Sequence, residues 1–176
     1  MKLPERKRNR LQDYDYGQNG AYFITFCTQN KERLLWNQME TVGEHSVLPL
    51  DNPPVEGESF DLPSLSKYGE IVENAINIIP HKYSMISVEK YVIMPNHVHL
   101  LLKIHNDDDR SGSTMCSPTI SKVVKHLKEY VTKQIGIPIW QRSFHDHVIR
   151  NQDDYRLIWD YIDNNPLKWK QDFFYS

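Results

Sequence analysis

The sequence predicts an α+β sandwich, an antiparallel sheet with helices packed on one face. Strand-like and helical runs alternate along the chain in the order strand, helix, hairpin, helix, short strand, helix. A composition of 39% hydrophobic and 25% charged residues is typical of a globular protein. Because 176 residues suffice for one core, we expect a single domain over 1–176.

The first part of the chain contains one strand between two irregular segments. Residues 1–19 are polar and basic, and we expect them to form an N-terminal arm. Ala21–Thr28 reads AYFITFCT, whose aromatic and β-branched residues favour a strand. Residues 43–65 carry four prolines and little periodicity, which predicts a loop insertion.

The middle of the chain predicts a helix followed by a hairpin. A helix is expected from about Ser66, with an apolar stripe at helical spacing from Ile71 to Ile79, and Pro80 is expected to stop it. In 86–104, two β-rich runs flank Pro95 and Asn96, a turn pair, which indicates an antiparallel hairpin.

The last third predicts two helices around a short strand. Ser117 followed by Pro118 is a good helix start, and the helical pattern continues to about 136. A strand is expected within 139–149. Asn151 or Asp153 can cap the last helix, and Pro166 ends it.

Charge and cysteine content exclude some classes of protein. The net charge of −2 gives no global sign of nucleic-acid binding, but the basic residues are segregated. Cys27 and Cys116 form no CxxC pair, so we expect no zinc–thiolate site and a cytoplasmic protein. No apolar run is long enough to cross a bilayer, and we expect no membrane partner. Charge alone favours a solvated tail and an ordinary helix face for the segregated basic residues. The ones that could instead contact phosphates are Arg6, Lys7, Arg8, Arg10, Lys122 and Lys125.

His97 and His99 are the first candidates for chemistry. Residues two apart on a strand share a face, so both imidazoles point to one side and Val98 and Leu100 point to the core. Burying two imidazoles is costly unless they share a partner, and a divalent metal would serve. Two separately hydrogen-bonded histidines on a half-exposed strand remain an equal alternative.

Tyr161 and Asn165 lie four residues apart at the end of the last helix and therefore share a face. A tyrosine hydroxyl is a possible nucleophile if a base or a metal activates it. The amide oxygen of Asn165 is a hard ligand that suits Mg²⁺ or Mn²⁺. Core packing for Tyr161 and an ordinary helix end for Asn165 are the competing interpretations.

His145 and His147 form a second HxH pair, between Arg142 and Arg150. We expect that one of these histidines packs or binds the DNA backbone together with the two arginines. A zinc hydrolase built on this pair is an alternative that the spacing leaves open.

Three segments resemble the REP-associated tyrosine transposases, relatives of the single-tyrosine insertion-sequence transposases within the HUH endonucleases. The run MPNHVH at 94–99 resembles the histidine–hydrophobe–histidine motif of the HUH endonucleases. Two C-terminal runs look like the signature of the group, SFHDHVIRN at 143–151 and YIDNNP at 161–166. The opening at 10–16 and 20–25 is also similar. The related insertion-sequence enzymes carry Gln at the position of Asn165.

The resemblance implies a ferredoxin-like core with the histidine pair on a central strand. It implies one divalent ion, Mg²⁺ or Mn²⁺, held by His97, His99 and Asn165, with Tyr161 as the catalytic nucleophile. The implied substrate is single-stranded DNA with palindromic hairpins, cleaved through a 5′-phosphotyrosine intermediate. We expect DNA contacts from Arg142, His147 and Arg150, a nucleoid-associated location, and a monomer rather than a dimer. A non-catalytic hairpin-binding protein of the same fold is the alternative.

Overall fold

The structure is a computed structural model that describes residues 15–37, 64–105, 119–166 and 169. Seven main elements follow one another along this part of the chain. They are β1 (Gly20–Cys27), α1 (Lys67–Lys82), β2 (Ile86–Ile93), β3 (His97–Ile104), α2 (Ile120–Ile135), β4 (His145–Ile149) and α3 (Gln152–Asn164), with a 3-10 turn at Gln29–Lys31 after β1. The expected arm and the 43–65 insertion lie almost wholly outside the described residues.

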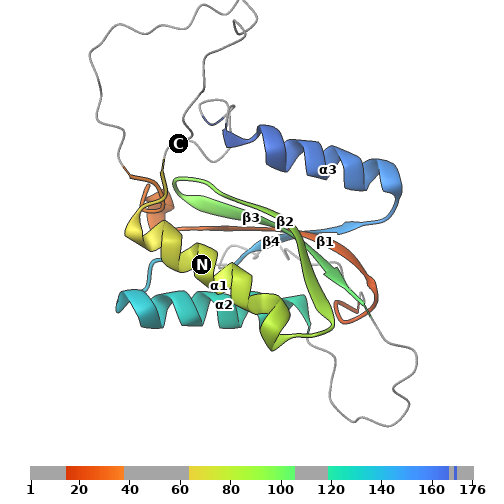
Figure 1. Ribbon diagram of the computed structural model, residues 1–176, viewed down its shortest axis with the longest axis horizontal. Coiled ribbons are helices and arrows are strands. Elements are labelled where there is room, and N and C mark those ends of the chain that lie inside the picture. Colours follow the sequence, from red (N-terminus) through yellow and green to blue (C-terminus); the bar gives the residue numbers. More distant parts are fainter. Residues whose placement is uncertain (1–14, 38–63, 106–118, 167–168, 170–176) are drawn as a thin grey trace, which may run out of the picture.

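The four strands form one antiparallel sheet in the order β2-β3-β1-β4. With α1 and α2 connecting the strands, this is the topology of a ferredoxin-like fold, and the predicted fold class is confirmed (Figure 1). Strand β3 lies inside the sheet between β2 and β1, so the histidine pair is on a central strand as expected. Strand β4 forms one edge of the sheet.

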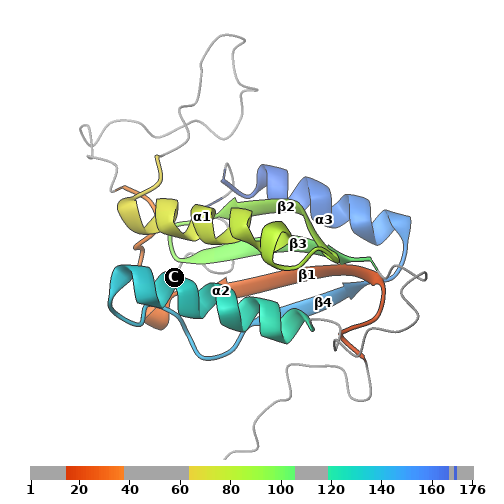
Figure 2. The same cartoon turned by 60° about the horizontal axis from the view of Figure 1, so that its bottom comes forward.

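Helices α1 and α2 pack side by side on one face of the sheet, whereas α3 lies across the opposite face (Figures 1 and 2). The expectation that helices pack on one face therefore applies to α1 and α2 but not to α3. Alternating strand residues explain the first layer, because Tyr22, Ile24 and Phe26 of β1 are buried in the core with Val98 and Leu100 of β3. The other face of β3 is buried as well, except at Lys103.

Helix α3 is attached differently from α1 and α2. Its spacing predicts inward-facing Tyr155, Ile158, Trp159 and Ile162, but only Ile162 is buried, and Trp159 is exposed. Polar contacts replace the missing apolar burial. The hydroxyl of Tyr155 donates to Glu89 of β2, and Lys90 pairs with Asp163.

The end of α1 differs from the sequence prediction. Pro80 lies inside α1, which continues to Lys82, because buried Ile79 keeps this turn against the core and Tyr83 N still donates to Ile79 O at 2.9 Å. Helix α2 begins at Ile120 and is capped by Thr119, whose hydroxyl accepts from Lys122 N. The predicted start at Ser117 and Pro118 lies outside the described residues.

The predicted helix start at about Ser66 is confirmed, and Ser66 caps this helix by accepting from Gly69 N. Of the two residues predicted to cap the last helix, Asn151 does so by accepting from Asp154 N. Among the helices of the described residues, none is long and apolar enough to cross a membrane.

Candidate active site

The histidine pair begins β3, directly after the turn at 94–96. The turn is fixed from outside the hairpin, since Leu35 N donates to Pro95 O and Thr28 N donates to Asn96 O. His97 and His99 are both buried, at 0% and 1% exposure. The half-exposed strand of the alternative interpretation is therefore not observed, although each histidine has a hydrogen-bond partner of its own.

Each imidazole has a polar partner on its Nδ1 side. His97 Nδ1 lies 2.8 Å from Asn96 Oδ1, and Asn96 in turn donates through Nδ2 to Lys31 O at 3.3 Å. With the amide oriented in this way, His97 Nδ1–H donates to Asn96 Oδ1, and His97 Nε2 faces His99. His99 Nδ1 lies 2.7 Å from Thr25 Oγ1 on the neighbouring strand.

The two Nε2 atoms face each other at 3.0 Å. Two nitrogens that are each about 2.1 Å from one ion and about 90° apart would be about 3.0 Å from each other. Burial and the neighbouring His97 together lower the pKa of His99 well below its usual value, which keeps the ring neutral. A neutral imidazole is the form that binds a metal, so the pair fits the ligands of one divalent ion.

Tyr161 reaches this pair from α3. Its hydroxyl lies 3.4 Å from His99 Nε2, and its ring makes edge contacts with His99 and with Phe23 of β1. Phe23 also stacks on His99 with ring centroids 5.1 Å apart. Because 43% of Tyr161 is exposed, core packing does not account for this tyrosine, and a DNA strand could approach it from solvent.

Asn165 lies one turn beyond Tyr161 at the end of α3. It is only 3% exposed, and neither Oδ1 nor Nδ2 has a hydrogen-bond partner among the described residues. Trp169, four residues further on, lies against His97 with ring centroids 5.8 Å apart. Asn165 thus lies in sequence between Tyr161 and Trp169, which both contact the histidine pair. A buried carboxamide without a hydrogen-bond partner is costly, and a hard cation would provide a partner.

The sequence predicts a donor set of two imidazoles and one amide for this site. No group of three or more His, Cys, Asp and Glu side chains suited to a metal occurs in the part of the chain that the structure describes. A site built on His97, His99 and Asn165 has only two donors of those types. The unpartnered Asn165 amide is the observation that fits a third ligand, and the ligand role of Asn165 stays a prediction.

The position of α3 depends on the edge strand β2. A bulge between Val88 and Lys90 interrupts the register with β3, and Glu89 and Lys90 both reach α3 from this point. The Lys90 ammonium lies 4.0 Å above the Trp159 ring. These contacts attach the helix that carries Tyr161 to the sheet that carries the histidines.

The predicted DNA contacts fall on different faces. Arg142, His147 and Arg150 are exposed and flank or belong to β4, next to the histidine face. Lys122 and Lys125 are exposed on α2, which lies across the sheet from α3 (Figure 2). Arg6, Lys7, Arg8 and Arg10 lie outside the described residues.

Lys128 differs from its neighbours on α2. Its ammonium donates to Gln141 O at 2.9 Å and to Ser143 O at 2.8 Å, which ties α2 to the segment before β4. Burial lowers its pKa to about 8. Lys128 is therefore a structural residue and not part of a phosphate-binding face.

The second HxH pair does not resemble a zinc site. His147 Nε2 lies 2.9 Å from Asp154 Oδ2, and His145 is exposed on the edge strand. The two do not belong to any three-residue cluster of metal-binding type among the described residues.

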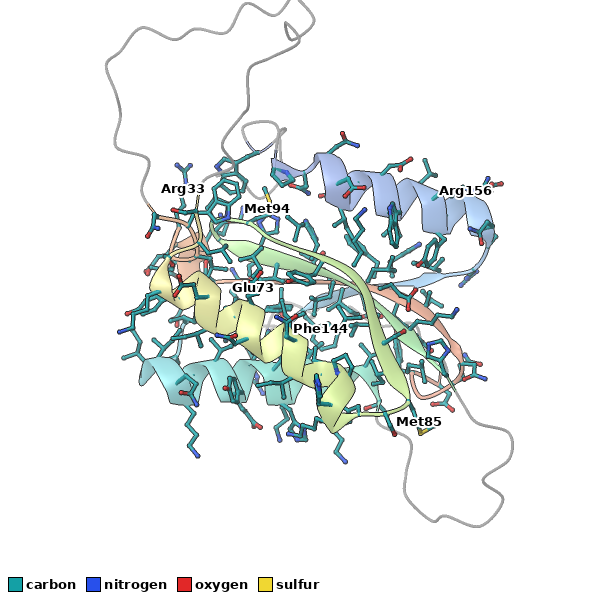
Figure 3. The ribbon with its side chains drawn as sticks, viewed as in Figure 1. Arg33, Glu73, Met85, Met94, Phe144 and Arg156 are labelled. Atoms are coloured by element: carbon teal, nitrogen blue, oxygen red, sulfur yellow. The ribbon has the colours of Figure 1, made fainter. Side chains whose placement is uncertain are left out.

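Several residues at the site escaped the sequence prediction. Thr25 and Phe23 come from a strand predicted only as core, and their role follows from the register that sets Thr25 opposite His99. Asn96 could have been found, because it directly precedes His97 in the turn. Arg33 lies over Trp169, and Figure 3 shows Arg33 and Met94 together beside the β2–β3 turn, at the end of the molecule where α3 ends.

Among known proteins, one uncharacterized relative matches nearly the whole chain. Two relatives that are named as transposases match a shorter part of it. No protein-family model matches. An uncharacterized protein of Haemophilus influenzae is 28% identical over 190 residues, covering 98% of this chain and 94% of the relative. A REP-associated tyrosine transposase of Escherichia coli is 33% identical over 82 residues, covering 46% of this chain and 44% of the relative.

A putative REP-associated tyrosine transposase of Haemophilus influenzae is 32% identical over 82 residues, covering 43% of this chain and 47% of the relative. The matches thus span less than half of each of these two named relatives. Among solved structures, a REP-associated tyrosine transposase bound to a REP hairpin matches with a TM-score of 0.59 and 23% identity, covering 94% of this chain and 74% of that one. The homologues of this chain therefore include proteins named REP-associated tyrosine transposases, and the chain shares the fold of one such protein.

Proposed function

We propose that this chain is a transposase-like endonuclease and strand transferase of the REP-associated tyrosine kind, acting on single-stranded DNA with hairpins. The observation that carries the proposal is the approach of Tyr161 to the buried histidine pair, with 3.4 Å between its hydroxyl and His99 Nε2. Packing alone would not bring the hydroxyl of a tyrosine that is 43% exposed next to a buried imidazole.

The chemistry proposed for Tyr161 is an in-line attack on phosphorus. Its oxygen forms the new P–O bond, the bond from phosphorus to the 3′ oxygen breaks, and the proton lost by the tyrosine is balanced by the one gained by the 3′ hydroxyl. The products are a 5′-phosphotyrosine and a free 3′ hydroxyl. Because the covalent bond retains the energy of the broken one, another 3′ hydroxyl can take the strand in the reverse reaction.

His97, His99 and Asn165 would hold one divalent ion, for which we propose Mg²⁺ or Mn²⁺. When bound, the ion would neutralise charge on the phosphate and lower the pKa of a nearby hydroxyl. The residues of this chain contribute orientation. Asn96 fixes the ring of His97, Thr25 fixes that of His99, and Phe23 supports both His99 and Tyr161.

Hairpin DNA is the proposed partner because the solved relative is described as bound to a REP hairpin. The exposed Arg142, His147 and Arg150 next to the site, and the Lys122 and Lys125 pair on α2, would contact phosphates. Contacts of this kind make binding weaker as salt rises. We expect the protein to act as a monomer, because Tyr161 meets His99 within one chain.

The test is covalent capture of the DNA. Wild type, Tyr161→Phe and the control Tyr130→Phe, an exposed tyrosine on α2, are incubated with a hairpin-bearing single strand and Mn²⁺ and separated under denaturing conditions. We expect an adduct with wild type and the control and none with Tyr161→Phe. Hairpin binding without cleavage under any divalent ion would indicate a non-catalytic binding protein instead. Cleavage that persists in Tyr161→Phe would refute the tyrosine mechanism.

A further inference from the structure

The face of the sheet that carries the histidine pair is only partly covered. Helix α3 packs against β2, at one side of this face. Strands β1 and β4 form the other side, where Phe23 is half-buried and His145 and His147 are exposed. Cross-strand pairing sets His147 opposite Phe23 and His145 opposite Thr25, so these side chains share the face of His99.

This uncovered half leads directly to the proposed site. Thr25 pairs with His99 on one side and with His145 on the other, so the Cα atoms of the two histidines are two strand spacings apart, about 10 Å. Phe23 touches both His99 and Tyr161. A chain of nucleotides lying along β4 could therefore reach the site past Phe23, beside the start of α3, where Asp154 contacts His147.

We propose that this surface, formed by Phe23, His145 and His147 between Arg142 and Arg150, is the track that holds the single-stranded DNA adjoining the cleaved phosphate. The assignment rests on the proposed function. It adds His145 as the residue that contacts the phosphate next to the site, and Phe23 as the ring on which a neighbouring base stacks.

Charge and hydrogen bonding favour DNA as the occupant. Arg142 and Arg150 stand at the two ends of β4, and neither guanidinium pairs with a carboxylate among the described residues. His147 is bonded to Asp154, whereas His145 has no partner in the described part of the chain, which leaves its imidazole available to a phosphate. Aromatic rings beside cationic groups are the usual means of holding a single strand without reading its sequence.

The competing surface is the lysine pair of α2. Lys122 and Lys125 lie on the opposite side of the sheet, so a single strand bound there could not also reach Tyr161 without passing around the β4 edge (Figure 2). That surface is more suited to a distant part of the DNA. The single-stranded segment itself is assigned to β4.

The first test measures binding without cleavage. In EDTA, fluorescence anisotropy gives the affinity of wild type and His145→Ala for a hairpin with a single-stranded flank and for the same hairpin without it. We expect His145→Ala to weaken binding of the flanked hairpin by about 3- to 10-fold and to leave the bare hairpin unaffected. The control is His81→Ala, an exposed histidine at the end of α1. Equal affinity of wild type and His145→Ala for the flanked hairpin would overturn the assignment.

The second test maps the strand directly. Single 5-iodouracils are placed along the flank, the complex with wild type is irradiated in EDTA, and the cross-linked peptide is identified by mass spectrometry. Cross-links to Phe23 or to the segment 142–150 support the track, and cross-links confined to α2 overturn it. Neither test requires cleavage. If wild type forms no covalent adduct in Mn²⁺ but these results hold, the proposed function fails and the binding track stands.

Discussion

Replacing Asn165 should make the metal-free protein more stable and the metal-bound protein less responsive to its ion. In Asn165→Ala, two buried polar atoms that have no partner among the described residues are removed. Leaving a buried amide unsatisfied costs about 1–3 kcal/mol, and the small cavity left by alanine costs about 1 kcal/mol. The free energy of unfolding in EDTA should therefore rise by about 1 kcal/mol relative to wild type.

The response to metal should change in the opposite direction. At an Mn²⁺ concentration about 100 times its Kd, wild type gains about 2.7 kcal/mol of stability. Loss of a ligand weakens metal affinity by at least about tenfold, so the variant should gain about 1.4 kcal/mol or less at the same concentration. Asn165→Asp should show the reverse pattern, because its buried carboxylate is destabilising alone and a better ligand with the ion present.

Urea unfolding followed by circular dichroism, in EDTA and in Mn²⁺, measures both effects. Asn164→Ala is the matched control, since Asn164 is the exposed neighbour whose amide donates to Asp160 O within the helix. The reasoning is refuted if Asn165→Ala lowers stability in EDTA by more than about 1 kcal/mol and still gains as much from Mn²⁺ as wild type. That result would make Asn165 an ordinary structural residue.

Three further predictions concern the Lys90 contacts that attach α3, the pKa of His99, and the close approach of Gly69 to Leu35. Lys90→Met should slow formation of the covalent adduct by about tenfold or more while hairpin affinity is retained. The reason is that α3 loses its ion pair with Asp163, so Tyr161 shifts. Lys90→Arg should retain most of the rate. The pKa of His99 is lowered on folding, so the unfolded state binds more protons, and stability in EDTA should fall as pH drops below about 6.5 by up to about 1.4 kcal/mol per pH unit. Urea unfolding at pH 7.5 and 5.5 checks this, and the His99→Asn variant should lose that part of the slope. Gly69→Ala should destabilise the protein by about 1–3 kcal/mol, since the new Cβ would lie 2.2 Å from Leu35 O. Thermal unfolding tests this, with Glu70→Ala at an exposed position as the control. An unchanged Tm would contradict the prediction and show that the segment at Leu35 can move.

Local rules were enough to predict most of the fold from the sequence. The hairpin followed from two β-rich runs around Pro95 and Asn96, and the start of α3 followed from Asn151 as a cap. Pro80 was misjudged because the rule for proline describes an isolated helix, whereas burial of Ile79 holds this turn in place. The side of the sheet that α3 would cover was also missed. Its attachment depends on Glu89 and Lys90 of a bulged strand, and a bulge leaves no clear signal in the sequence.

Local spacing rules also predicted part of the site. Period-two spacing placed His97 and His99 on one face, and four-residue spacing placed Tyr161 with Asn165. Thr25 and Phe23 could not be found in this way, because the β1–β3 register that brings them to His99 is set by long-range packing.

The most direct measurement of the central claim is the identification of the residue that becomes linked to DNA. After reaction with the hairpin strand in Mn²⁺ and nuclease digestion of the DNA, trypsin should release residues 157–168, which contain Tyr161 as their only tyrosine. Mass spectrometry should then find a nucleotide joined through a 5′-phosphate to that peptide. A nucleotide on any other peptide, or DNA cleaved with no protein-linked nucleotide, would contradict Tyr161 as the nucleophile.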